Sequence, residues 1–115
     1  MAKVYEFLAN GFEEVEALAP VDILRRGGIE VKMVSVTGSN LVESSHGVVV
    51  KADLLFESIT DFSDADLLML PGGMPGSKNL NEHEGVRNAL KAQFEKGKRV
   101  AAICAAPLVL ASVGL

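Results

Sequence analysis

The sequence predicts an α/β fold in a single domain, and three observations support this. Segments of strand character alternate with segments of helix character, and glycines mark the joints between them. Residues 66–70 are almost wholly apolar, which is typical of a short parallel strand buried on both faces. The chain has 115 residues, of which 49% are hydrophobic, so it can form one core and little more.

The first predicted unit is a strand followed by a helix. Residues 3–8 are the strand, and Asn10, with Glu13 three positions later, resembles a helix N-cap with its acidic partner. The helix should then continue to about Arg26, where the glycine pair 27–28 stops it.

The later segments continue the alternation. Residues 29–36 predict a second strand, and the stretch 41–50 predicts an excursion at the sheet edge, such as a hairpin. The buried strand ends in the loop 71–76, and a helix closed by Gly97 precedes the strand 99–103. Apolar side chains recur every fourth residue on that helix, at Val86, Leu90 and Phe94.

Three loops should meet at one edge of the sheet. Strands joined by right-handed helical crossovers run parallel, and binding sites form beyond their carboxyl ends. The three are the loop after Leu8, the loop 71–76 and the turn at Cys104. We therefore expect the functional groups in these segments.

Cys104 is the only cysteine, and it lies between an apolar strand and the start of a helix. Pro107 fits the first helical turn, because its fixed φ and missing N–H cost nothing there. A thiol at this position faces the positive end of a helix, which favours the thiolate and therefore a nucleophile. A small buried hydrophobic side chain is the alternative, and this segment alone leaves both open.

Gly72 and Gly73 follow the buried strand directly. Without Cβ atoms, their consecutive N–H groups can point into a concave site and bind a developing oxyanion. Glycine pairs are also ordinary in turns, which is the alternative interpretation. The spacing matches neither a Walker loop nor a dinucleotide-binding loop, so we expect no phosphate cofactor.

Glu16 differs from the other acidic residues of the first helix. Glu13 and Glu14 are explained by the helix dipole, whereas Glu16 lies near the apolar face and Pro20 should bend the helix there. A carboxyl in an apolar setting tends to stay protonated, and it can then donate a hydrogen bond to a thiolate. The alternative is a partly exposed surface glutamate.

The two histidines do not suggest a metal site. His46 and His83 are far apart in the sequence, and neither has a partner at metal-ligand spacing with Cys104. We expect His83 at a solvated helix start and His46 in a solvent-facing loop, from which it could also reach a site. No metal and no other cofactor is expected.

Composition argues against several classes of function. The net charge is −4 and the 11 lysines and arginines are scattered, so we expect no nucleic-acid partner. The N-terminal residues contain no apolar run long enough for a signal peptide or a membrane span. A single cysteine cannot form an internal disulfide, so we expect a cytoplasmic protein without a membrane partner.

Four separated motifs together resemble one known family. They lie at residues 11–16, 20–29, 70–73 and 101–107. In this order they resemble the ThiJ/PfpI superfamily, in the branch of the Parkinsonism-associated protein deglycase and its bacterial relatives. The resemblance implies a flavodoxin-like sandwich with a mostly parallel sheet, a homodimer, and a reactive cysteine on a nucleophile elbow. It also implies that a protonated Glu16 bonds the cysteine sulfur and that Gly72 and Gly73 line the site.

Two departures limit this resemblance. Peptidase-like members place a histidine directly after the cysteine, where this chain has Ala105, so we expect no proteolysis. The family's domain also continues well beyond the helix after the elbow. Residues 1–115 are therefore expected to be the N-terminal part of a single ThiJ/PfpI-type domain, incomplete at its C-terminus and unstable as an isolated monomer.

The resemblance suggests a cysteine-dependent enzyme that acts on methylglyoxal-type dicarbonyls or on their adducts with proteins. Cys104 would add to the aldehyde, and Glu16 would move the proton. The backbone N–H groups of Gly73 and Ala105 would hold the oxyanion. The alternative is a non-catalytic redox sensor or stress chaperone in which Cys104 is oxidised to a sulfinate.

Overall fold

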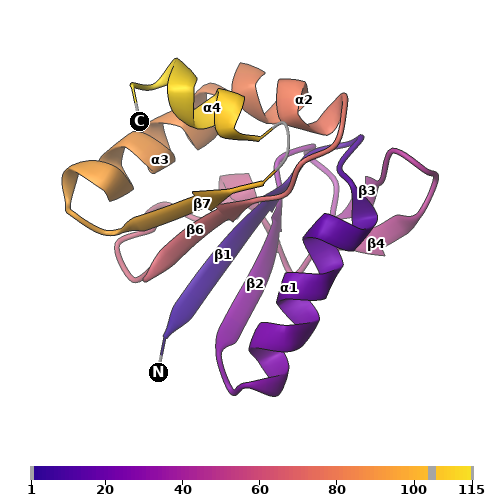
Figure 1. Cartoon of the computed structure of the whole chain (residues 1–115), viewed down its shortest axis with the longest axis horizontal. Helices are drawn as coiled ribbons and strands as arrows, with labels where there is room; N and C mark the ends of the chain where they lie inside the picture. The colour runs from indigo at the N-terminus through magenta and orange to yellow at the C-terminus, as the bar shows by residue number, and fades with distance from the viewer. Residues whose placement is uncertain (1, 104–105, 115) are drawn as a thin grey trace.

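A five-stranded parallel sheet organises the computed structural model of the chain, which describes residues 2–103 and 106–114 (Figure 1). The strand order is β5-β2-β1-β6-β7. These strands are β1 (Lys3–Leu8), β2 (Glu30–Ser35), β5 (Leu54–Leu55), β6 (Leu67–Leu70) and β7 (Arg99–Ala102). A separate antiparallel hairpin is formed by β3 (Leu41–Glu43) and β4 (Val49–Lys51).

Helices cover both faces of the sheet (Figure 1). They are α1 (Glu14–Arg26), α2 (Gly76–Glu82), α3 (Glu84–Glu95) and α4 (Pro107–Ser112), with the short 3-10 helix η1 at Phe56–Ser58. The α1 helix lies on one face, where its Ala17 and Val21 join a core with the hairpin residue Val42. The other three helices lie on the opposite face, where Leu90 and Val109 belong to a second core.

Strand β1 supplies side chains to both cores. Because side chains alternate along a strand, Val4 and Leu8 face the α1 side while Tyr5 and Phe7 face the other helices. All four are buried, as expected for a central parallel strand.

The predicted α/β fold with a mostly parallel sheet is confirmed. Residues 3–8 form β1 as predicted, and β2, β6 and β7 are each slightly shorter than the predicted strands. The stretch 41–50 lies almost entirely in the predicted hairpin, which ends at Lys51. Within the described residues, we find no helix with both the length and the apolar character that a bilayer span requires.

The start of α1 differs from the prediction. Glu13, not Asn10, is the N-cap, since its carboxylate accepts hydrogen bonds from the backbone N–H groups of Val15 and Glu16. The Asn10 side chain instead accepts a 3.1 Å hydrogen bond from the Glu43 N–H and so holds the hairpin. The helix starts later because the segment before it makes tertiary contacts instead.

Helix α3 buries two of the three apolar positions that recur along it. Val86 and Leu90 are fully buried, but Phe94 is 53% exposed and Gln93 is buried instead. An α-helix has 3.6 residues per turn, so a four-residue spacing drifts away from the buried face with each repeat. No element was predicted for residues 77–82, which belong to α2, or for β5, which has only two residues. Helix α1 runs through Pro20 without interruption.

Candidate functional site

Two loops at the carboxyl edge of the sheet pack backbone against backbone. The N–H of Glu13 donates a 2.9 Å hydrogen bond to the carbonyl of Gly72, and the N–H of Gly76 donates a 3.0 Å bond to the carbonyl of Gly11. One loop follows β1 and the other follows β6, and these strands are direct neighbours. The start of α1 is thereby held against the glycine-rich loop.

This packing requires glycine at specific positions. Gly73 has a φ of +97°, and a Cβ atom there would lie 2.4 Å from the Glu13 nitrogen. A Cβ atom on Gly76 would lie 2.6 Å from the Phe12 nitrogen. The structure thus gives Gly73 a steric role. The sequence had suggested only two roles for it, oxyanion binding or an ordinary turn.

Glu16 lies in the first turn of α1 and contacts the glycine-rich loop. The N–H of the buried Gly72 donates a 3.1 Å hydrogen bond to Oε1 of Glu16, which is half-buried. The structure therefore brings together Glu16 and Gly72, two of the predicted site residues. The same bond occupies the Gly72 N–H, which leaves the Gly73 N–H as the candidate oxyanion donor of the pair.

The predicted residues Cys104 and Ala105 lie outside the described residues, but the elements on both sides are described. Strand β7 ends at Ala102, and its last residue pairs with Leu70, the last residue of β6. Helix α4 begins with Pro107 at its first position, as the sequence predicted. In the sequence, Cys104 therefore comes between β7 and α4, and β7 is the neighbour of β6, the strand that precedes Gly72.

Comparison with known proteins identifies the family. A model of the DJ-1/PfpI family matches residues 2–115. The chain belongs to the DJ-1/PfpI family. The resemblance inferred from the four motifs is thus confirmed.

Individual relatives cover nearly all of this family member. Protein DJ-1 homolog A of Arabidopsis thaliana is 43% identical over 109 residues, which cover 94% of this chain and 28% of that protein. Deglycase TK1284 of Thermococcus kodakarensis is 37% identical over 114 residues, which cover 98% of this chain and 66% of that protein. The structure of Toxoplasma gondii DJ-1, oxidized, matches with a TM-score of 0.95 at 39% identity, covering 99% of this chain and 62% of that one. The chain thus spans only part of the length of these DJ-1/PfpI relatives.

This DJ-1/PfpI chain also pairs two residues that the sequence analysis kept apart. His46 Nδ1 lies 2.9 Å from Oε1 of Glu14, with 69% of the His46 side chain exposed and 17% of that of Glu14. The hydrogen bond to Glu14 raises the pKa of His46. The pKa of Glu14 is lowered, mainly by a backbone hydrogen bond and also by the hydrogen bond with His46. His46 is exposed in a loop, as predicted, but no sequence spacing indicated its partner. His83 caps α3, which agrees with the predicted helix start.

Glu6 is a buried carboxyl that the sequence analysis did not single out. It is fully buried in β1, where it pairs across the sheet with Met33 of β2 and Met69 of β6. Among the described residues, neither of its oxygens has a hydrogen-bond partner. Removal from water raises its pKa to about 9, opposed by the charge of Arg25. The sequence did contain a signal for this buried carboxyl, because Glu6 is an acidic residue within an otherwise largely apolar strand.

Proposed function

We propose that this protein is a cysteine-dependent glyoxalase or deglycase that acts on methylglyoxal-type dicarbonyls or on their adducts with proteins, releasing lactate or glycolate. The observation that carries the proposal is the hydrogen bond from the Gly72 N–H to Glu16, in the loop after β6; this strand pairs with β7, the strand that precedes Cys104 in the sequence. A relative at 37% identity is named a deglycase, which supports the same class of chemistry. No metal or other cofactor takes part in the proposed reaction.

The first step forms a covalent adduct. The Cys104 thiolate attacks the aldehyde carbon of methylglyoxal, a C–S bond forms, and the π electrons of the carbonyl move onto its oxygen. Glu16 gives its proton to that oxygen, which yields a hemithioacetal. The N–H groups of Gly73 and Ala105 stabilise the charge that develops on this oxygen before the proton arrives.

The second stage is an internal oxidation and reduction. The Glu16 carboxylate removes the proton from the sulfur-bearing carbon and returns it to the neighbouring ketone carbon, while the hydroxyl proton of the hemithioacetal moves to the ketone oxygen. The first carbon thereby becomes a thioester and the second an alcohol. Water then cleaves the C–S bond and releases lactate and the free thiol, so the reaction consumes one water and no external oxidant.

The test measures lactate formed from methylglyoxal by the purified protein. We expect Cys104→Ser to abolish turnover, because a serine hydroxyl is not ionised at neutral pH and Ala105 offers no base beside it. The matched control is Glu95→Gln, at the exposed end of α3, which should keep wild-type turnover. Lactate formation that survives Cys104→Ser would refute the mechanism.

A second candidate function is a redox sensor or oxidative-stress chaperone. The similar Toxoplasma gondii structure is described as oxidized, which favours this alternative. Two peroxide molecules would each transfer one oxygen to the Cys104 sulfur and leave as water, giving a sulfinate. Absent turnover, together with a peroxide-dependent mass gain of two oxygens on Cys104, would establish the sensor in place of the enzyme.

We also propose that the protein acts in the cytoplasm as a homodimer. Apolar side chains are exposed on α1 and on the hairpin, including Val15 (67%), Ile23 (66%) and Val49 (56%). Exposed apolar side chains gathered on neighbouring elements are typical of interaction surfaces. Sedimentation equilibrium tests this, and a monomer at micromolar concentration would contradict it.

A further inference from the structure

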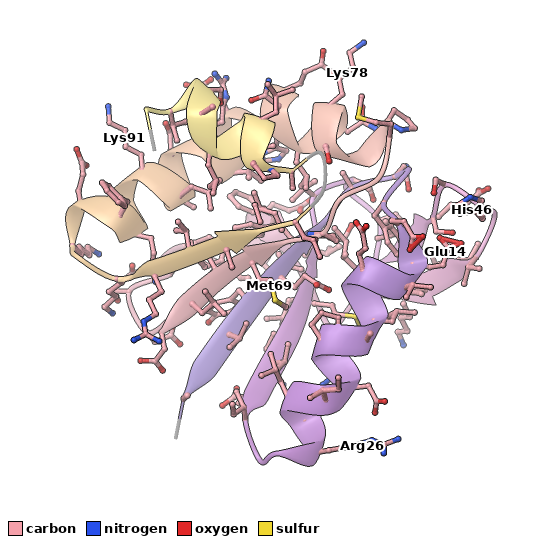
Figure 2. All side chains as sticks on the ribbon, in the orientation of Figure 1. Glu14, Arg26, His46, Met69, Lys78 and Lys91 are labelled. Carbon is pink, nitrogen blue, oxygen red and sulfur yellow. The ribbon has the colours of Figure 1, made fainter. Side chains whose placement is uncertain are left out.

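Three side chains of metal-ligating type converge at the start of α1. Glu13, Glu14 and His46 each offer one ligand atom, and these atoms all lie within 4.8 Å of one another. Figure 2 shows Glu14 on α1 and His46 on the hairpin turn lying close together. Two carboxylates and an imidazole are therefore gathered from segments that are more than 30 residues apart in the sequence.

The hairpin is fixed in the position that brings His46 to the helix. The N–H of Ser45 donates a 2.8 Å hydrogen bond to the carbonyl of Phe12, and the N–H of Gly11 donates a 2.8 Å bond to the carbonyl of Glu43. Both bonds join the residues directly before Glu13 and Glu14 to the residues directly before His46. The imidazole is thus held near the carboxylates by the fold, and its placement does not depend on the ion pair alone.

We propose that Glu13, Glu14 and His46 form a binding site for a divalent transition-metal ion, with Zn²⁺ as the ion that suits the ligands best. Imidazole nitrogen combined with carboxylate oxygen is a ligand set that Zn²⁺ accepts, whereas Ca²⁺ and Mg²⁺ require oxygen ligands. Three protein ligands leave a fourth position for water.

The spacing of the ligand atoms fits this ion. His46 Nδ1 lies 2.9 Å and 3.1 Å from the two carboxylate oxygens of Glu14. Tetrahedral zinc with bonds of about 2.0–2.2 Å places neighbouring ligand atoms roughly 3.3–3.6 Å apart, so this pair needs to open by only a few tenths of an ångström. In Glu13, Oε1 accepts the two capping hydrogen bonds of α1, and a carboxylate has a second oxygen for a metal.

The site lies next to the candidate catalytic loop but does not depend on the proposed function. Glu13 is shared between the two, because its N–H bonds the carbonyl of Gly72 while its side chain caps the turn that carries Glu16. Metal binding and dicarbonyl turnover can therefore be measured separately. Failure of one leaves the other intact.

The experiment is titration calorimetry of the purified protein with Zn²⁺, repeated with Co²⁺, whose visible absorption reports its coordination. All measurements use a Cys104→Ser background, so that the thiol cannot supply a ligand. The test variants are His46→Asn and Glu14→Gln. The matched control is His83→Asn, since His83 is the other histidine and asparagine retains a helix-capping side chain.

We expect one saturable site in the background protein and in His83→Asn. His46→Asn and Glu14→Gln should each weaken binding by at least about 10-fold, the loss that removal of a supporting residue alone already causes. The absence of a saturable site, or equal affinity in the His46→Asn and His83→Asn proteins, would overturn the proposal. Both histidine variants should keep the far-ultraviolet circular dichroism of the parent.

Discussion

The backbone N–H of Gly72 donates a 3.1 Å hydrogen bond to Oε1 of Glu16, a residue 56 positions earlier in the chain. This bond joins the first turn of α1 to the loop after β6 and fixes the position of the carboxylate. A side chain held in this way at the carboxyl edge of a parallel sheet can act repeatedly on one bound substrate.

The first prediction concerns Glu16→Gln. The amide keeps a carbonyl oxygen for the Gly72 N–H but cannot carry a proton between atoms. We expect lactate formation to fall by about 10²- to 10⁴-fold, the usual contribution of general acid–base catalysis. Iodoacetamide should still alkylate Cys104 in this variant. Turnover within a few-fold of wild type would show that Glu16 does not move the proton.

The second prediction concerns the reactivity of Cys104. Its position before a helix start favours the thiolate, and thiols at helix N-termini ionise at about pH 3.5–7.5 instead of about 8.5. The rate of alkylation measured against pH should therefore reach half its maximum below about pH 7.5. A midpoint near that of free cysteine would remove the argument for an activated nucleophile.

The third prediction compares two glycines that share a positive φ. Gly28 has a φ of +83° and open space where a Cβ atom would lie, with nothing within 4 Å, whereas Gly73 combines +97° with a contact of 2.4 Å. Gly28→Ala should lower the free energy of unfolding by roughly 1–2 kcal/mol through backbone strain alone. Gly73→Ala should lower it by roughly 1–3 kcal/mol more, because the methyl group overpacks the loop. Equal losses in urea denaturation would contradict the steric role of Gly73.

The fourth prediction concerns Glu6 and pH. Its pKa is raised from 4.5 to about 9 in the folded protein by removal from water. Between these values the unfolded chain releases this proton while the folded protein keeps it, so the free energy of unfolding falls as pH rises. The contribution of this residue is at most about 1.4 kcal/mol per pH unit. The stabilisation that Glu6 contributes is fully present below pH 4.5 and is lost as pH approaches 9.

Glu6→Gln tests this prediction, because a neutral amide of the same shape does not titrate. Urea denaturation at several pH values between 5 and 9 should give a shallower fall in stability for Glu6→Gln than for wild type. Glu95→Gln, at an exposed position, should keep the wild-type slope. Parallel slopes for wild type and Glu6→Gln would mean that Glu6 does not titrate as its burial implies.

The elements that the sequence predicted well are those with a local cause. Residues 3–8 form β1 because a short apolar run is buried on both faces, and Pro107 begins α4 because its backbone suits a first turn. Helix α2 was missed because its glycine and polar residues lack a clear apolar period, and Leu80 is its buried large apolar residue. Phe94 continues the apolar repeat but is exposed, because a four-residue spacing only approximates the helical period.

The sequence by itself determined the α/β class, the family through its four motifs, and Cys104 and Glu16 as candidate site residues. These depend on residue type and on order along the chain, which are local properties. Only the tertiary structure decided that the Gly72 N–H bonds Glu16, that His46 pairs with Glu14, and that Glu6 is buried with no hydrogen-bond partner among the described residues. Each of these depends on which distant segments approach one another, and the packing of the sheet, the hairpin and α1 determines that approach.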